Sequence, residues 1–303
     1  MKKSELKPGV AVAPQGECEF SLIPNSKLLD LYAAMLKCRA VADRIPNSTP
    51  RRRKGPFLIS EAVTAGVTID LLANDAISPA PSDPTPCVLK GVALQTLLRW
   101  WSHPAMRLSA HVARAHIIPP AGSAAARLEA SLRLAAHFRS ASGGSVVVFF
   151  VGPDVPLSKS AASPGLSHQL LEPFLHRAAA ERLPILLVGQ SHQNGEDLLS
   201  IAEQSGVPGM AVDRDDVVAI YRVASEALSH ARRGNGPTLI VCKPWTVGGR
   251  KNQARQVRDP VRKMELYLAG KGLSSKLVKQ KFERELAAEL GLRIEARARA
   301  KRP

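Results

Sequence analysis

Two apolar stretches, SVVVFFVGPD (Ser145–Asp154) and LPILLVGQSH (Leu183–His192), decide how this chain folds. Each is a run of β-branched, aliphatic or aromatic residues that ends abruptly in small and polar residues. Such runs are typical of strands that are buried on both faces of a parallel sheet. In open α/β sheets, ligands bind at the carboxyl edge, where the loops after the strands converge. The sequence therefore predicts a binding crevice after these two strands.

Helical patterns alternate with short apolar runs along most of the chain, which predicts an α/β fold with a doubly wound, mostly parallel sheet. The segment 74–86 holds four prolines, so we expect no regular element there. The predicted strands are 146–151, 185–188, 209–212 and 237–242. The predicted helices are one capped by Asn25 or Ser26, one starting near Ser60, and those at 88–101, 123–138, 172–182, 196–204, 216–233 and 275–290.

The chain of 303 residues has 45% hydrophobic content, which is enough for a substantial core. We expect an N-terminal arm (1–24), one large domain (25–270) and a basic C-terminal helix or tail (271–303). Lys and Arg number 42 against 26 Asp and Glu, a net charge of +16. Residues 243–303 hold 17 basic and 6 acidic residues, a net of +11. A basic tail attracts nucleic acid or an acidic protein, although a solvated basic face explains it more simply.

The four cysteines are far apart in the sequence and form no CxxC pair. This spacing argues against a zinc site and against a disulfide framework, so we expect a reducing, cytoplasmic location. The first residues lack the continuous apolar region of a secretory signal, and no apolar run is long enough to cross a membrane. We therefore expect no contact with a membrane.

Several blocks, in order and at the right spacing, resemble the α subunit of the thiamine-diphosphate-dependent 2-oxo acid dehydrogenases, the E1α family of pyruvate, branched-chain and acetoin dehydrogenases. The resemblance spans roughly residues 24–273. It implies the thiamine-diphosphate-binding fold, with the cofactor and Mg²⁺ at the predicted crevice. The blocks are LLDLYAAML (28–36), SEA (60–62), LPILLV (183–188), VPGMAVD (207–213), DDV (215–217) and GPTLI (236–240).

The family places Gly-Asp-Gly after one strand and Asn-Asn after the next, so that side-chain oxygens bind Mg²⁺ and glycines approach the diphosphate. Here the first motif reads Val-Gly-Pro-Asp and the second reads Gln-Ser-His (190–192). The resemblance implies Asp154 and Ser191 as metal ligands and Gly152 as a contact of the cofactor. A neutral histidine, such as His192, is a poor ligand for a hard cation.

Two further cofactor contacts follow from the resemblance. Glu61 stands in the position of a family Gly-Gln-Glu-Ala motif, where it would contact the cofactor or another subunit. Its alternative role is to stabilise the start of a helix. Arg250 replaces a family histidine and could bind a phosphate. The Tyr-Arg pair that contacts the diphosphate is replaced by Ala-Pro-Ser-Asp (80–83).

These departures predict an E1α-like subunit with impaired or altered cofactor binding. By resemblance it would catalyse oxidative decarboxylation together with a separate E1β-like subunit, in a heterotetramer, and pass an acyl group to a lipoyl-bearing E2. The alternative is a non-catalytic paralogue, a pseudoenzyme that serves in assembly or regulation. A nucleic-acid-associated protein that uses the basic tail ranks below both.

Overall fold

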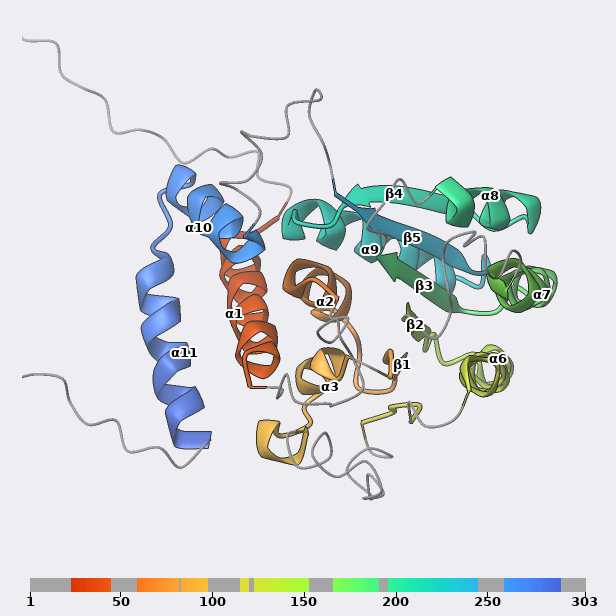
Figure 1. Cartoon of the computed structure of the whole chain (residues 1–303), viewed down its shortest axis with the longest axis horizontal. Helices are drawn as coiled ribbons and strands as arrows, with labels where there is room; N and C mark the ends of the chain where they lie inside the picture. Colours follow the sequence, from red (N-terminus) through yellow and green to blue (C-terminus); the bar gives the residue numbers. More distant parts are fainter. Residues whose placement is uncertain are drawn as a thin grey trace, which may run out of the picture.

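The computed structural model describes residues 23–44, 59–81, 83–97, 115–119, 123–152, 166–190, 196–244 and 259–289. Strands and helices alternate through most of these ranges (Figure 1). The strands are β1 (Ala76–Ser78), β2 (Val147–Val151), β3 (Ile185–Gln190), β4 (Gly209–Asp213) and β5 (Thr238–Lys243). The helices are α1 (Asn25–Ala42), α2 (Glu61–Thr68), α3 (Thr85–Leu89), α6 (Ala124–Ala141), α7 (Leu166–Ala180), α8 (Glu196–Gln204), α9 (Val217–Arg232), α10 (Pro260–Gly270) and α11 (Ser275–Glu289).

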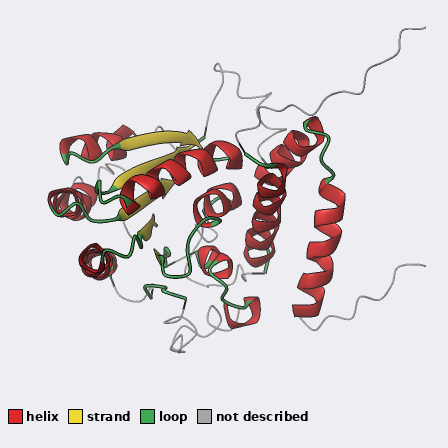
Figure 2. Cartoon of the chain, turned by 180° about the vertical axis from the view of Figure 1, so that it is seen from behind, coloured by secondary structure: helices red, strands yellow, loops and turns green. Residues whose placement is uncertain are grey.

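The five strands form one parallel sheet in the order β1-β2-β3-β5-β4. Parallel neighbours need crossover connections, and helices supply them on both faces of the sheet (Figures 1 and 2). The predicted doubly wound, parallel α/β fold is therefore confirmed. The two quoted stretches form adjacent strands, with Val151 of β2 opposite Gly189 of β3.

Alternate residues of each strand enter two separate cores. Val148 and Phe150 join the core beneath α1, α2 and α9, whereas Val147, Phe149 and Val151 join the core beneath α6, α7 and α8. All five side chains are fully buried. Because successive side chains of a strand point to opposite faces, an uninterrupted apolar run is required when both faces are covered.

The helices α1, α10 and α11 add an outer layer on the α2 side of the sheet (Figure 1). The hydroxyl of Tyr32 donates to Glu265 across 2.9 Å and fastens α1 to α10. The ammonium of Lys263 lies 2.8 Å from Asp213, at the end of β4. No side chain of α11 is fully buried, and Val278 and Phe282 are its apolar contacts with the core.

Three local expectations were wrong. β1 lies inside the segment that we expected to be irregular, because its three residues precede the first proline, Pro79. Instead of one helix at 88–101, the structure has α3, which begins at Thr85 and ends at Leu89. It ends there because Gly91 has a φ of 85°, which a right-handed helix does not allow. The chain is helical again at 94–97. Neither Asn25 nor Ser26 caps α1, whose N-cap position is Pro24.

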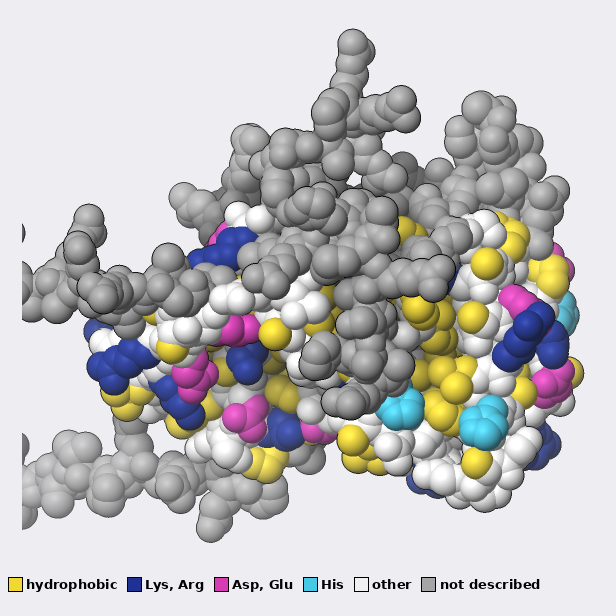
Figure 3. Space-filling view, turned by 90° about the horizontal axis from the view of Figure 1, so that it is seen from below, with side chains coloured by type: hydrophobic (Ala, Val, Ile, Leu, Met, Phe, Trp, Pro, Cys, Tyr) yellow, Lys and Arg dark blue, Asp and Glu magenta, His cyan; other side chains and the backbone are white. Residues whose placement is uncertain are grey.

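The helix α10 was not predicted, although Asp259-Pro260 is a clear start signal. The carboxylate of Asp259 accepts hydrogen bonds from the backbone N–H groups of Val261 and Arg262, and proline suits the first helical position. The charges of α11 are mixed, and basic and acidic side chains intermingle on the face drawn in Figure 3. Among the described residues, no helix combines the length and the apolar character that crossing a bilayer requires.

Candidate functional site

The carboxyl ends of β2 and β3 form the centre of the candidate site. Because Val151 pairs with Gly189, the next residues, Gly152 and Gln190, stand side by side at this edge. Both are buried. The other predicted contacts of the cofactor, Asp154, Ser191 and Arg250, lie outside the described residues, as does His192. Their roles therefore stay predictions.

Gln190 connects this edge to the start of α2. Its side-chain oxygen accepts a hydrogen bond of 2.7 Å from the backbone N–H of Ser60, and its side chain is only 4% exposed. From the sequence, Gln190 is expected only as part of an altered motif, without a role of its own. The signal was present, because a polar residue that ends a fully apolar strand needs a buried partner.

Asp83 binds the backbone N–H of Ile59, the residue before Ser60. It is fully buried, and it accepts hydrogen bonds from the N–H of Ile59 at 2.9 Å and from the N–H and hydroxyl of Thr85 at 2.9 and 2.6 Å. Burial raises the pKa of Asp83 to about 6, and the hydrogen bonds from Thr85 and Ile59 oppose that shift. Asp83 and Gln190 thus fix two consecutive amides at the entry of α2.

Glu61, the first residue of α2, forms an ion pair with Arg39 of α1. The same guanidinium donates to both carboxylate oxygens of Asp259, at 3.1 and 2.5 Å. The hydrogen bond from Arg39 lowers the pKa of Asp259. Burial alone would lower the pKa of Arg39, but its hydrogen bonds to Asp259 and Glu61 raise it. Arg39 therefore joins the starts of α2 and α10.

A second cluster of charged side chains surrounds the turn between β4 and α9. Lys263 bridges Asp213 at 2.8 Å and Asp216 at 3.3 Å, and Arg214 lies 3.5 Å from Asp215. Burial raises the pKa of Asp215. Asp216 also caps α9 by accepting from the N–H of Ala219. These carboxylates serve the packing of α9 and α10.

Arg127 of α6 brings a positive charge to the carboxyl ends of β1 and β2. Its side chain is buried, and it donates to the carbonyl of Pro79 at 2.8 Å and to the hydroxyl of Ser78 at 3.1 Å. The guanidinium also lies 4.4 Å from the centre of the Phe149 ring. No sequence pattern singles out this arginine, because α6 is alanine-rich and holds two more arginines, Arg133 and Arg139.

The described residues do not fit a magnesium ion by themselves. Within the described ranges, no three His, Cys, Asp or Glu side chains are grouped as a metal site requires. At the centre of the site, Gln190 is bonded to Ser60, and Glu61 is paired with Arg39. A magnesium site at this edge would therefore depend on Asp154 and Ser191.

Comparison with known proteins shows which proteins this chain is similar to. The model of the dehydrogenase E1 component family matches residues 189–302. The pyruvate dehydrogenase E1 component subunit alpha of Acholeplasma laidlawii is 28% identical over 42% of this chain and 44% of its own length. The alpha subunit of the acetoin:2,6-dichlorophenolindophenol oxidoreductase of Bacillus subtilis is 27% identical over 74% of this chain and 71% of its own. The chain is E1α-like.

Two further comparisons concern a plant subunit and a solved structure. The chloroplastic pyruvate dehydrogenase E1 component subunit alpha-3 of Arabidopsis thaliana is 34% identical over 39% of this chain and 30% of its own. A solved structure from Mycobacterium smegmatis, described as a thiamin diphosphate-dependent enzyme, has 17% identity and a TM-score of 0.39, over 66% of this chain and 37% of that one. The alignments span 44% and 36% of the pyruvate dehydrogenase subunits of A. laidlawii and Porphyra purpurea.

The family match begins at Gly189, inside β3. It therefore includes Gln190 and Ser191 but not the end of β2, where Gly152 and Asp154 stand. The segment Val-Gly-Pro-Asp (151–154), which we expected to replace the first cofactor motif, therefore lies in the part of the chain outside the match.

Proposed function

We propose that this E1α-like chain is a subunit of a 2-oxo acid dehydrogenase that works with a separate E1β-like subunit and binds thiamine diphosphate in an altered site. The proposal rests on one observation: Gly152 and Gln190 are adjacent at the carboxyl edge of a parallel sheet. The named relatives, alpha subunits of pyruvate dehydrogenase and of an acetoin oxidoreductase, support it.

When bound, thiamine diphosphate supplies the electron sink that lets a 2-oxo acid lose carbon dioxide. We assign to Gly152 the close approach of backbone to diphosphate. Asp154 and Ser191 would offer oxygen ligands to Mg²⁺, and Arg250 would contact a phosphate. The ion pair between Glu61 and Arg39 favours a role for Glu61 in orienting α2 at a subunit contact.

Contacts within the chain would fix the geometry of the carboxyl edge of the sheet before a cofactor binds. Asp83 and Gln190 hold the backbone of Ile59 and Ser60, and Arg39 holds Glu61. Preorganised contacts of this kind lower the cost of binding a cofactor. A partner in the form of an E1β-like subunit, in a heterotetramer, and a lipoyl-bearing E2 complete the proposal.

A non-catalytic paralogue is the second candidate. It is favoured by one observation, namely that Gln190 and Glu61 are engaged within the protein rather than presented to a ligand. In this case the fold would serve assembly or regulation of an E1 complex. We also propose a cytoplasmic location for either candidate, since Cys38, Cys87 and Cys242 are free and buried thiols.

Calorimetric titration of the full chain with thiamine diphosphate and Mg²⁺, with and without an E1β-like subunit, tests the proposal. We expect saturable binding that Asp154→Ala abolishes, because a carboxylate is the strongest candidate ligand for Mg²⁺ here. Asp30→Ala, which removes an exposed carboxylate of α1, is the matched control and should bind like the wild type. Absence of binding in both settings would instead support the non-catalytic paralogue.

A further inference from the structure

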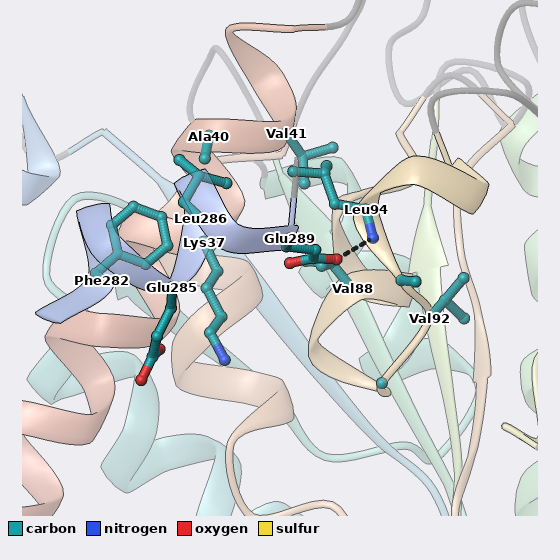
Figure 4. Close-up of a pocket in the computed structure, with 12 residues that line it drawn as sticks. Lys37, Ala40, Val41, Val88, Val92, Leu94, Phe282, Glu285, Leu286 and Glu289 are labelled. Carbon is teal, nitrogen blue, oxygen red and sulfur yellow. Dashed lines mark hydrogen bonds between the residues drawn. The ribbon is translucent and has the colours of Figure 1, made fainter. Parts of the chain in front are cut away.

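A hollow of about 220 Å³ lies between α1, α11 and the segment that follows α3 (Figure 4). Gly91, which has a φ of 85° and ends the turn after α3, is one of the residues that line it. Its apolar walls come from three separate parts of the chain. They are formed by Ala40, Val41, Val88, Val92, Leu94, Phe282 and Leu286.

Glu289 closes one end of this hollow. Its carboxylate accepts a hydrogen bond of 2.7 Å from the N–H of Leu94, and its carbonyl accepts one of 2.7 Å from the side chain of Gln95. These two bonds attach the end of α11 to the segment 94–97. Glu289 is therefore occupied, and its charge is directed at the protein backbone.

Two side chains of opposite charge, Lys37 and Glu285, also line the hollow. Lys37 extends from α1 and Glu285 from α11, and Figure 4 shows both side chains running in the same direction beside it. Within the described part of the chain, the ammonium of Lys37 has no hydrogen bond and no ion pair. Glu285 has a single exposed partner, Lys281, at 3.8 Å. Both charges are thus available to a ligand.

We propose that this hollow binds a free α-amino acid with an apolar side chain. The carboxylate of the amino acid would pair with Lys37, its ammonium with Glu285, and its side chain would enter the apolar space. A simple carboxylate or a simple amine would meet one attractive and one repulsive charge, whereas a zwitterion satisfies both. Nothing in this site overlaps the carboxyl edge of the sheet, so the inference is independent of the proposed function.

The size of the hollow sets the kind of side chain. An apolar cavity of roughly 150 Å³ holds a benzene ring, so about 220 Å³ accommodates the side chain of leucine, methionine or phenylalanine. Ligand sites combine such apolar space with a few polar groups that fix orientation. Glycine, which has no side chain to bury, should bind far more weakly.

Calorimetric titration of the full chain with L-leucine and L-phenylalanine, without thiamine diphosphate, tests the inference. We expect saturable binding at one site. Glycine, 4-methylpentanoate (without the ammonium) and 3-methylbutylamine (without the carboxylate) should each bind at least roughly tenfold more weakly, because each lacks one of the three interactions.

Two charge variants locate the site. Lys37→Gln and Glu285→Gln should each weaken leucine binding by roughly tenfold, and Val92→Phe should block the hollow. Lys276→Gln is the control, because Lys276 lies on α11, as Glu285 does, but does not line the hollow. Circular dichroism and thermal unfolding establish that the variants fold, and Lys37→Gln alters an exposed residue. No saturable heat up to about 10 mM ligand, equal binding of 4-methylpentanoate, or unchanged binding in Lys37→Gln would each overturn the inference.

Discussion

At the scale of single residues, polar side chains organise the candidate site, and two of them, Asp83 and Gln190, are buried. Asp83 and Gln190 hold consecutive amides, and Arg39 is shared by Glu61 and Asp259. The two buried side chains, Asp83 and Gln190, both have partners, as buried polar groups must have if they are not to cost stability. The entry of α2 is consequently defined by side chains from α1, β3, α10 and the loop that precedes α3.

Asp83 should make stability depend on pH. Its pKa is raised from 3.8 to about 6 by burial, so the native chain retains a proton that the unfolded chain loses between these values. The contribution of Asp83 to the free energy of unfolding is complete below about pH 4 and is lost as the pH rises through 6. The change amounts to about 3 kcal/mol at most.

Urea unfolding of wild type and Asp83→Asn at pH 4.5 and pH 7 measures this effect. The stability of the wild type relative to the variant should fall as the pH rises, because asparagine does not titrate. Asp30→Asn, at an exposed position of α1, serves as the control for loss of a carboxylate. A difference between wild type and Asp83→Asn that is the same at both pH values would contradict the account.

At the scale of the elements, α2 and α9 pack closely against each other at Gly66. A Cβ added at Gly66 would lie 2.8 Å from the side chain of Ile220 and 3.1 Å from the backbone nitrogen of Tyr221. The absence of a side chain at Gly66 therefore lets the two helices approach. This approach determines where α2 presents Glu61.

Gly66→Ala should destabilise the fold by about 1–3 kcal/mol, despite the gain of about 1 kcal/mol that alanine brings inside a helix. The backbone of α9 cannot move away as a flexible side chain can. Gly270→Ala is the matched control, since a Cβ there meets nothing within 4 Å. Thermal unfolding of both variants measures the difference; a Gly66→Ala protein as stable as Gly270→Ala would refute the close contact.

The sequence could predict most of the elements near the sheet and fewer of those outside it. β2 and β3 were clear because strands covered on both faces are apolar throughout, as Val147 to Val151 are. β1 was missed because only three residues pair, too few for any periodicity. α10 was missed because its exposed Leu266 and Tyr267 blur the helical pattern.

The position of the site in the fold could be predicted from the sequence, but the contacts between its side chains could not. The strand ends gave the edge of the sheet, and the resemblance gave Gly152 and Glu61. Arg39, the partner of Glu61, stands 22 residues before it, and Asp259, which shares the guanidinium of Arg39, stands 198 residues after it. Such distant contacts depend on how α1 and α10 pack, which local patterns do not encode.

At the scale of the whole molecule, the E1α-like chain builds one parallel sheet whose carboxyl edge holds Gly152 and Gln190 at adjacent strand ends. The five strands and two cores provide a rigid frame, and the polar contacts at the start of α2 hold the edge in one arrangement. We propose that this frame works as the α subunit of a 2-oxo acid dehydrogenase with an altered cofactor site.

Release of carbon dioxide from a panel of 2-oxo acids, by the full chain mixed with an E1β-like subunit, tests this claim most directly. The account predicts release that requires both chains, Mg²⁺ and thiamine diphosphate, and that Asp154→Ala removes while Asp30→Ala does not. A stable complex of the two chains that releases no carbon dioxide from any of these acids at saturating cofactor would contradict it.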